Sequence, residues 1–230
     1  FQNDIISLNM EKTKNHKQSP PSFKAKTNIY GPNKDASMKR VILITGTPCV
    51  GKTSIAKQLA DKLNAQFINL TDFAKTYNLT SGEDTERQTT IIDEEAMQKK
   101  LKETIETSKH TNIIVEGHYA AAVTPNRQVT IVFVLRRNPK ELKEFMQKCG
   151  FSEAKIYENL SAEIIDTCLV EAMQTQSGKV CELDVTGKTV DDTVTQILDV
   201  LDKRKNCYAG IVDWLGLLER EGLTDQYLKV

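Results

Sequence analysis

The sequence predicts an α/β fold with a parallel β-sheet covered by helices on both faces, and three observations support this prediction. Short apolar runs, such as residues 41–45, alternate along the chain with segments whose apolar residues recur at helical spacing. Residues 129–135 are a nearly unbroken apolar run, as expected for a strand buried on both faces. A glycine-rich loop joins the first run to the first helical segment. This alternation is typical of right-handed βαβ units.

The glycine-rich loop, residues 46–53, matches the P-loop pattern G-x-x-x-x-G-K-[ST] at every fixed position. Gly46 and Gly51 permit backbone angles that other residues avoid, so the loop can curl around a phosphate with its N–H groups pointing inward. The helix that begins near Lys52 adds partial positive charge. Lys52 would reach the β- and γ-phosphates, and the Thr53 hydroxyl would ligate Mg²⁺. The sequence therefore predicts a P-loop NTPase fold that binds a nucleotide.

The composition is ordinary for one substantial α/β domain: 39% of the 230 residues are hydrophobic, 27% are charged, and the formal net charge is zero. Charge alone therefore suggests neither a nucleic acid nor a membrane as partner. No apolar run is long enough to span a membrane. Five cysteines are widely spaced without a C-x-x-C pair, which argues against a disulfide framework and against a zinc site. We expect free thiols and a cytoplasmic location.

Residues 1–37 are expected to be a disordered basic extension. Residues 1–40 hold eight Lys or Arg against three Asp or Glu, and residues 12–26 are polar and contain prolines. Such a segment has too little apolar surface to offset the entropy of ordering. We expect the natural domain to begin at Met38. A basic tail that touches RNA is the alternative interpretation.

Five strands are expected, at residues 41–45, 66–70, 111–118, 129–135 and 179–184. A helix follows the P-loop, and Thr71 and Asp72 would cap the next one. Residues 79–92 are polar and without periodicity, which indicates a loop. Asp93 would cap a helix on which apolar residues recur every four positions: Met97, Leu101 and Ile105.

The second half contributes four expected helices. Pro139 opens one that ends at Gly150, and Ser152 caps another with an apolar stripe that continues to Leu169. Thr189 caps a third. Residues 209–222 would form a separate amphipathic helix with the only tryptophan, within a C-terminal helical tail of residues 206–230.

Ligands of open parallel sheets bind at the carboxyl ends of the strands. This rule places the P-loop on one edge with Asp72, Glu116, His118 and the polar segments at 136–137 and 184–187. An N-K-x-D stretch, which a GTPase would use to read its base, is missing, and so is the paired carboxylate of larger ATPases. Glu116, followed two residues later by His118, suits a small phosphotransferase.

Seven stretches resemble, in unbroken order, the adenylate kinase isoenzyme 6 family, especially its archaeal members. They are residues 44–53, 67–75, 90–95, 114–118, 132–137, 148–164 and 182–189. The resemblance implies a nucleoside monophosphate kinase-like domain at residues 38–205. Within it, residues 69–92 would bind the monophosphate, and residues 148–157 would form a short lid without cysteine pairs.

The resemblance also implies an activity. The family transfers the γ-phosphoryl group of ATP to AMP, with Mg²⁺, to give two ADP. It also implies an ATPase role in maturation of the small ribosomal subunit, through a small-subunit ribosomal protein or the pre-ribosome. The alternative is a nucleotide-gated assembly factor with little kinase activity, and a kinase of a small metabolite is a third hypothesis.

Two positions depart from the family pattern. Cys49 replaces a glycine of the loop, where we expect a small residue to matter more than a positive φ. Cys149 replaces the lid arginine, which clamps transferring phosphates in a way that a thiol cannot. Lys148, Arg136, Arg137 or Lys155 would have to substitute for it.

The candidate residues have distinct expected roles. Glu116 would hold a water of the Mg²⁺ shell, and His118 would orient an attacking water, although a structural histidine at a strand end is the alternative. Asp72 is either a site residue or only a helix cap. The expected catalytic residues are Lys52, Glu116, His118 and Arg136, and the metal site is Thr53 with Glu116. The expected nucleotide-binding residues are Gly46, Cys49, Val50, Gly51, Lys52, Thr53, Ser54, Cys149 and, near the ATP base, Lys188.

Overall fold

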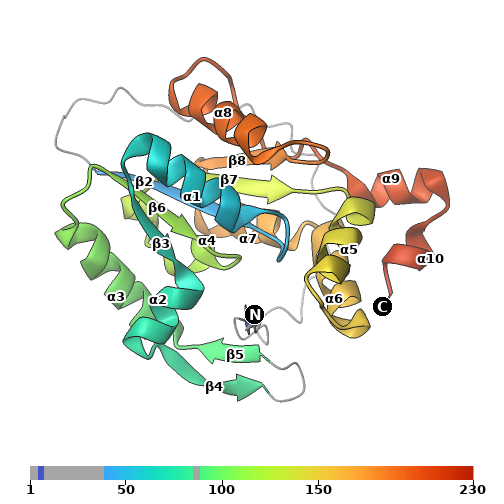
Figure 1. The fold of residues 1–230 in the computed structure, drawn as a ribbon, viewed down its shortest axis with the longest axis horizontal. Coiled ribbons are helices and arrows are strands. Elements are labelled where there is room, and N and C mark those ends of the chain that lie inside the picture. The colour runs from blue at the N-terminus through green and yellow to red at the C-terminus, as the bar shows by residue number, and fades with distance from the viewer. Residues whose placement is uncertain (1–4, 8–38, 85–88, 230) are drawn as a thin grey trace.

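A five-stranded parallel sheet forms the centre of the molecule in a computed structural model, which describes residues 5–7, 39–84 and 89–229 (Figure 1). Every neighbouring pair in this sheet runs parallel. This architecture confirms the predicted fold class. The strands, in spatial order, are β3 (Gln66–Asn69), β6 (Asn112–Glu116), β2 (Arg40–Gly46), β7 (Val129–Arg136) and β8 (Val180–Asp184).

Side chains of β2 alternate between two apolar cores, one on each face of the sheet. Ile42 and Ile44 pack on the face that carries α1 (Lys52–Leu63) and α8 (Val190–Leu201). Val41 and Leu43 point to the opposite core, as the two-residue period of a strand requires. That face carries α2 (Leu70–Tyr77), α3 (Glu94–Thr107), α4 (Ala120–Val123) and α7 (Thr167–Thr175).

Residues 139–164 and the C-terminal segment extend the first of these faces. In Figure 1 they lie together at the end of the sheet where the chain also ends. A short 3₁₀ turn, η2 (Asn126–Gln128), directly precedes β7. The helices of this end are α5 (Pro139–Lys148), α6 (Glu153–Ile164), α9 (Trp214–Glu221) and α10 (Thr224–Tyr227).

Helix starts follow the predicted capping residues with one exception. The side chains of Asp93 and Ser152 accept hydrogen bonds from backbone N–H groups in the first turns of α3 and α6. Thr189 forms a complete capping box with Asp192. The prediction of Thr71 and Asp72 as caps of α2 was wrong. Instead, the Asn69 side chain accepts from the Asp72 N–H at 2.9 Å, because β3 ends at Asn69 and the helix begins at the next residue.

Residues 80–84 and 89–92 form a hairpin where the sequence indicated a loop. The strands β4 (Thr80–Asp84) and β5 (Thr89–Ile92) pair antiparallel, and β1 (Ile5–Ser7) adds to β5 in parallel. Beyond β1, the predicted basic extension lies outside the described residues.

The apolar stripe that begins after Ser152 is divided between two helices. Asp166 has a left-handed backbone, with φ of 63°, and separates α6 from α7. Ile165, which we expected in the stripe, is 57% exposed at this break. The turn lets the Asp166 carboxylate reach the Arg136 guanidinium at 2.5 Å.

The C-terminal residues pack against the sheet domain. Trp214, Leu218 and Tyr227 are buried in the same core as α1 and α6. The helix begins at Trp214 rather than at residue 209, because the Asp213 side chain accepts a hydrogen bond from the Gly216 N–H and caps it there. No helix among the described residues is long and apolar enough to cross a membrane.

Cys181 and Cys207 form a disulfide bond, with their Cα atoms 5.3 Å apart. The expectation that all five cysteines are free thiols was therefore wrong. The two residues are 26 positions apart and belong to no motif, so their proximity arises only when the C-terminal segment packs beside β8. Cys49, Cys149 and Cys168 take no part in this disulfide bond.

Candidate active site

The phosphate-binding loop joins β2 to α1 at the carboxyl edge of the sheet. Gly46 has φ of 136°, and a Cβ there would lie 2.4 Å from the Leu135 carbonyl oxygen, so no larger residue fits without displacing β7. Gly51, with φ of 111°, precedes the first turn of α1 and provides no side chain to cap it. The N–H groups at this helix start can therefore bind an anion.

Cys49 also has a left-handed backbone, with φ of 64°. The expectation that this loop position needs a small residue more than a positive φ was wrong. The position requires a conformation that glycine adopts freely and that a residue with a Cβ adopts at a cost.

Lys52 lies against its own loop. Its side chain is buried, and its Nζ atom donates to the Thr47 carbonyl oxygen at 3.0 Å. The side chain of Val50, also in the loop, is fully buried. Thr53 and Ser54 are exposed in the first turn of α1. The ammonium is thus held at the loop, where a bound phosphate would meet it.

Thr53 and Glu116 meet across the edge of the sheet. The Thr53 hydroxyl donates to Glu116 Oε2 at 3.3 Å, and the Asn69 side-chain amide donates to the same oxygen at 2.5 Å. Glu116 is 3% exposed. A hydroxyl and a carboxylate are hard oxygen donors of the kind that Mg²⁺ prefers, so these residues fit the predicted metal. Sequence reasoning placed Asn69 in the expected monophosphate-binding segment and not beside the metal.

His118 lies on the same edge, two residues beyond Glu116. Its carbonyl oxygen accepts a hydrogen bond from Thr45 Oγ1 at 2.9 Å, and its half-buried ring meets Tyr119 edge-on at 4.9 Å. A Cβ on the intervening Gly117 would lie 2.9 Å from Leu70 Cδ1, which explains the glycine. The backbone of His118 is thus fixed, and a role for its ring stays a prediction.

Arg136 does not face the phosphate-binding loop. Its guanidinium is 1% exposed and binds the carboxylates of Glu163, Glu182 and Asp166 at 2.9, 2.7 and 2.5 Å. Burial lowers the pKa of Arg136, but these three carboxylates outweigh it and raise the pKa overall. The structure corrects the expectation of a catalytic arginine here, because every side of this cation is occupied by a structural partner.

Arg137 is the arginine that reaches the loop. Its Nε atom donates to the Val50 carbonyl oxygen at 3.2 Å, and its guanidinium lies over the Phe145 ring and pairs with Glu141. Its Nη2 atom would be 3.7 Å from a Cβ at Gly51. Arg137 therefore brings positive charge to the back of the loop.

Glu163, on α6, connects the phosphate-binding loop to α9. One of its oxygens accepts from Thr47 Oγ1 at 2.5 Å, and the other accepts from Trp214 Nε1 at 3.0 Å and from the Arg137 N–H at 3.1 Å. The side chain is 2% exposed. Sequence reasoning missed Glu163, although an acidic residue beside Ile164 in an apolar stripe was a signal for a buried carboxylate.

The remaining expected site residues lie around the loop. Lys188 is exposed after β8, where its Nζ atom donates to the Asp184 carbonyl oxygen at 2.5 Å and to Gln196 Oε1 at 3.0 Å. Cys149 follows α5, at the first of the residues expected to form the lid, and is exposed. Asp72 is exposed in the first turn of α2, where its backbone N–H donates to the Asn69 side chain.

Known proteins resemble this chain over most of its length. Residues 42–166 match the family model described as an AAA domain. A protein of Methanocaldococcus jannaschii named "Putative adenylate kinase" is 39% identical over 173 residues, which cover 75% of this chain and 92% of that protein. A protein of Pyrococcus furiosus with the same name is 36% identical over 183 residues, covering 78% and 93%.

A solved shikimate kinase from Bacteroides thetaiotaomicron is 19% identical, with a TM-score of 0.47, and covers 71% of this chain and 98% of its own. A similarity this low adds nothing to the argument, which rests on the sequence relatives. Identity above 30% over nine-tenths of each relative is decisive. The region matched by the family model contains the loop, Glu116 and residues 148–157. The chain therefore belongs to the adenylate kinase family of these archaeal proteins, the family that its seven sequence stretches resemble.

Proposed function

We propose that this protein transfers the γ-phosphoryl group of ATP to AMP, giving two ADP, with Mg²⁺ bound beside the loop. Its family makes it a phosphotransferase with a nucleoside monophosphate kinase core. AMP as the acceptor, Mg²⁺ as the metal and the individual residue roles are the finer parts of the proposal.

One observation supports the proposal most strongly: Lys52, Thr53 and Glu116 converge at a glycine-lined loop on the carboxyl edge of the sheet. Lys52 would compensate charge on the β- and γ-phosphates. Thr53 and Glu116 would hold Mg²⁺, which neutralises charge on the transferred phosphoryl group. The loop backbone and the start of α1 would bind the phosphate oxygens.

Phosphoryl transfer asks little covalent chemistry of the protein, so positioning and charge decide the rate. Arg137 and Glu163 would hold the loop in shape from behind, through Val50 and Thr47. Residues 69–92, which include α2, β4 and β5, would bind AMP, and residues 148–157 would close over the phosphates.

A second candidate is a nucleotide-gated assembly factor that hydrolyses ATP with a small-subunit ribosomal protein or the pre-ribosome as partner. The observation that favours it is the arrangement of arginines near the site. Arg136 binds three carboxylates, Arg137 holds Val50 and Glu141, and a thiol stands at position 149. If no arginine outside the described residues clamps the phosphates, the site would transfer the phosphoryl group slowly.

A coupled assay with ATP and a panel of AMP, CMP, UMP and dTMP tests the first proposal. We expect AMP to be phosphorylated fastest, and Lys52→Ala to lower kcat/KM by at least ~100-fold because the phosphate loses its nearest cation. Lys57→Ala, on the exposed side of the same helix, is the matched control. A Lys52→Ala protein with undiminished activity would refute the loop assignment.

The Cys149→Arg variant distinguishes the two candidates. If transfer to AMP is the function and the missing lid arginine limits it, kcat should rise at least ~10-fold, since such arginines contribute roughly 10³–10⁵ in related enzymes. The assembly-factor candidate predicts instead that no monophosphate is phosphorylated and that ATP hydrolysis appears only when the ribosomal protein is added.

A further inference from the structure

The C-terminal segment, residues 206–229, reaches the active site through the indole of Trp214. This residue begins α9 and is 7% exposed. Its Nε1 atom donates to Glu163 Oε1 at 3.0 Å. Leu218, one turn further along α9, is fully buried in the core that also contains the apolar side chains of α1. Packing thus holds the helix in place while its indole N–H binds one oxygen of a buried carboxylate.

The indole acts on the phosphate-binding loop through the carboxylate of Glu163. Three donors converge on its Oε1 atom: the indole, the Arg136 Nε atom at 2.9 Å and the Arg137 N–H at 3.1 Å. Because the two oxygens of a carboxylate are rigidly linked, donors that fix Oε1 also fix Oε2. Oε2 accepts from Thr47 Oγ1 at 2.5 Å. The indole therefore helps to determine where Thr47 lies in the loop.

Thr47 in turn holds the cation of the loop. Its side chain is 1% exposed. Its carbonyl oxygen accepts from the Lys52 Nζ atom at 3.0 Å and from the Val50 N–H at 3.3 Å. A shift of Thr47 moves the acceptor of both bonds, so the turn of the loop and the ammonium of Lys52 shift with it. A continuous chain of hydrogen bonds thus runs from α9 to Lys52.

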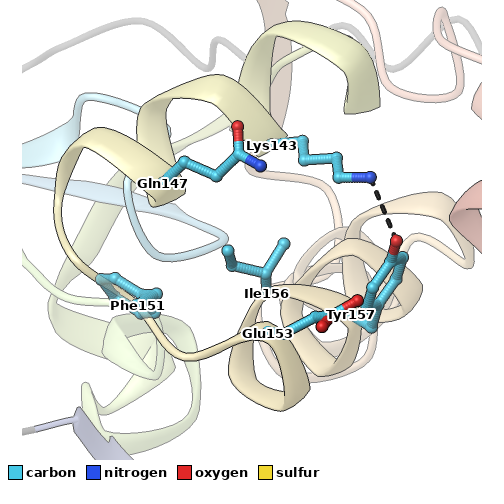
Figure 2. A pocket seen from close by; sticks show the side chains of 6 residues that line it. All are labelled: Lys143, Gln147, Phe151, Glu153, Ile156 and Tyr157. Carbon is cyan, nitrogen blue, oxygen red and sulfur yellow. Dashed lines mark hydrogen bonds between the residues drawn. The ribbon is translucent and has the colours of Figure 1, made fainter.

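A second contact of the C-terminal segment, with α5 and α6, is loosely packed. A cavity of about 340 Å³ lies between these two helices. Figure 2 shows the hydrogen-bonded side chains of Lys143 and Tyr157 beside it. Lys143 Nζ lies 5.2 Å from the centroid of the Tyr227 ring, and Lys229 Nζ lies 3.8 Å from that of the Tyr157 ring. Side chains beside open space can shift without moving their neighbours. The influence of the segment on the loop is therefore assigned to the buried bond of Trp214.

We propose that Trp214 is a positioning residue of the active site. Through Glu163 and Thr47 it holds the phosphate-binding loop and Lys52 in the shape that binds MgATP. The C-terminal segment then serves nucleotide binding as well as stability. The effect on phosphoryl transfer to AMP rests on the proposed function, whereas the effect on nucleotide binding needs only the loop.

Trp214→Phe tests the proposal, because phenylalanine fills much of the space of the indole but has no N–H group. We expect the Kd for a fluorescent ATP analogue with Mg²⁺ and the KM for ATP to rise roughly 3- to 10-fold, with the KM for AMP unchanged. A merely structural residue would lower the folded fraction, and with it kcat, without changing the KM for ATP.

A second replacement removes the same N–H group at nearly constant shape. Trp214 is the only tryptophan, so β-(3-benzothienyl)alanine incorporated in place of tryptophan enters at this position alone. It carries a sulfur where the indole carries its N–H. We expect the same rise in Kd and KM for ATP, and this protein decides the question if the phenylalanine variant does not fold.

A double-mutant cycle tests the path through Glu163. Thr47→Val breaks the chain at the loop, so Trp214→Phe combined with Thr47→Val should weaken binding no more than the more severe single change. Leu218→Val, which shortens a buried side chain of the same helix, is the control. It should lower the melting temperature and leave the Kd unchanged.

Three results would overturn the proposal: wild-type affinity in Trp214→Phe, effects that multiply in the double variant, or an equal loss of affinity in Leu218→Val. If the wild type binds the analogue but phosphorylates no AMP, the proposed function fails. The binding data then still decide the role of Trp214.

Discussion

The backbone angle of Cys49 is unfavourable for any residue with a Cβ and so raises the free energy of the folded state. Its φ of 64° lies in the left-handed region, where a Cβ crowds the following carbonyl oxygen. The loop needs this conformation to curl, so the strain persists in the folded protein. Glycine would adopt the same angle freely, but it also leaves the unfolded chain with more freedom.

Glycine and valine at position 49 should therefore change the stability in different ways. Cys49→Gly should leave the free energy of unfolding unchanged or raise it by up to about 1 kcal/mol. Cys49→Val should lower it by roughly 1–3 kcal/mol, because a β-branched residue tolerates positive φ least. Urea unfolding of both variants in reductant measures the difference. A valine variant as stable as the glycine variant would contradict the assignment of strain.

Among single residues, the sequence predicted the positions of those side chains that a local pattern fixes. Lys52 and Thr53 could be assigned because the helix start fixes where their side chains project. The arginine pair could not: Arg136 turns into the core and Arg137 toward the loop only because Glu163 arrives from a helix 26 residues later. Nothing within the strand itself distinguishes the two arginines.

The helices α3 and α7 bring two carboxylates close together, Glu94 and Glu171. Burial first, and then the charge of Glu94, raise the pKa of Glu171 to about 7 from an ordinary value of 4.5. Between these values the folded protein binds a proton that the unfolded chain has released. Stability therefore falls as the pH rises from about 4.5 to about 7, and the full penalty remains above that range.

Replacing Glu171 by Gln should remove this penalty. The variant should be more stable than the wild type by roughly 2–3 kcal/mol at pH 8.5, with a gain that shrinks toward zero near pH 4.5. Urea unfolding at the two pH values measures this dependence. Glu144→Gln, at an exposed position of α5, should show no such trend. A pH-independent gain for Glu171→Gln would mean that the carboxyl is not the cause.

Elements with a cap and an apolar stripe were predictable, because each signal is local. The hairpin β4–β5 was not, since its strands are short and polar and gain order from pairing with each other and with β1. The division between α6 and α7 was also hidden: the residue that breaks the helix, Asp166, does so while bound to a distant arginine.

The disulfide acts on the molecule as a whole, because it ties the C-terminal segment to β8, an edge strand of the central sheet. Closing a loop of 26 residues raises the free energy of the unfolded chain by about 3.5 kcal/mol in the chain-entropy model. Cys207→Ser should lose roughly that amount, seen as a lower urea midpoint without reductant. Dithiothreitol should lower the midpoint of the wild type to a similar value and leave the variant unchanged. A wild type insensitive to the reductant would show that the bond is absent in solution.

The sheet and its layers could be read from the alternation of elements, since parallel crossovers leave few arrangements for five apolar strands. The position of the C-terminal segment could not be predicted from the sequence. Its amphipathic pattern predicted a helix without saying which surface would bury it. The buried indole of Trp214, its bond to Glu163 and the disulfide become visible only once the chain is folded.

Trp214 gives the protein a built-in optical reporter, because it is the only tryptophan. Its indole N–H is bonded to Glu163, whose other oxygen holds Thr47 of the phosphate-binding loop. Any shift of the loop changes the electric field at the indole, so MgATP should alter the emission wavelength or intensity. Thr47→Val removes the hydrogen bond between the loop and Glu163, so it should reduce this change in emission. A titration with MgATP, with tryptophan excited at the red edge of its absorption band, measures the difference. Nucleotide occupancy could then be followed by light alone, without a label.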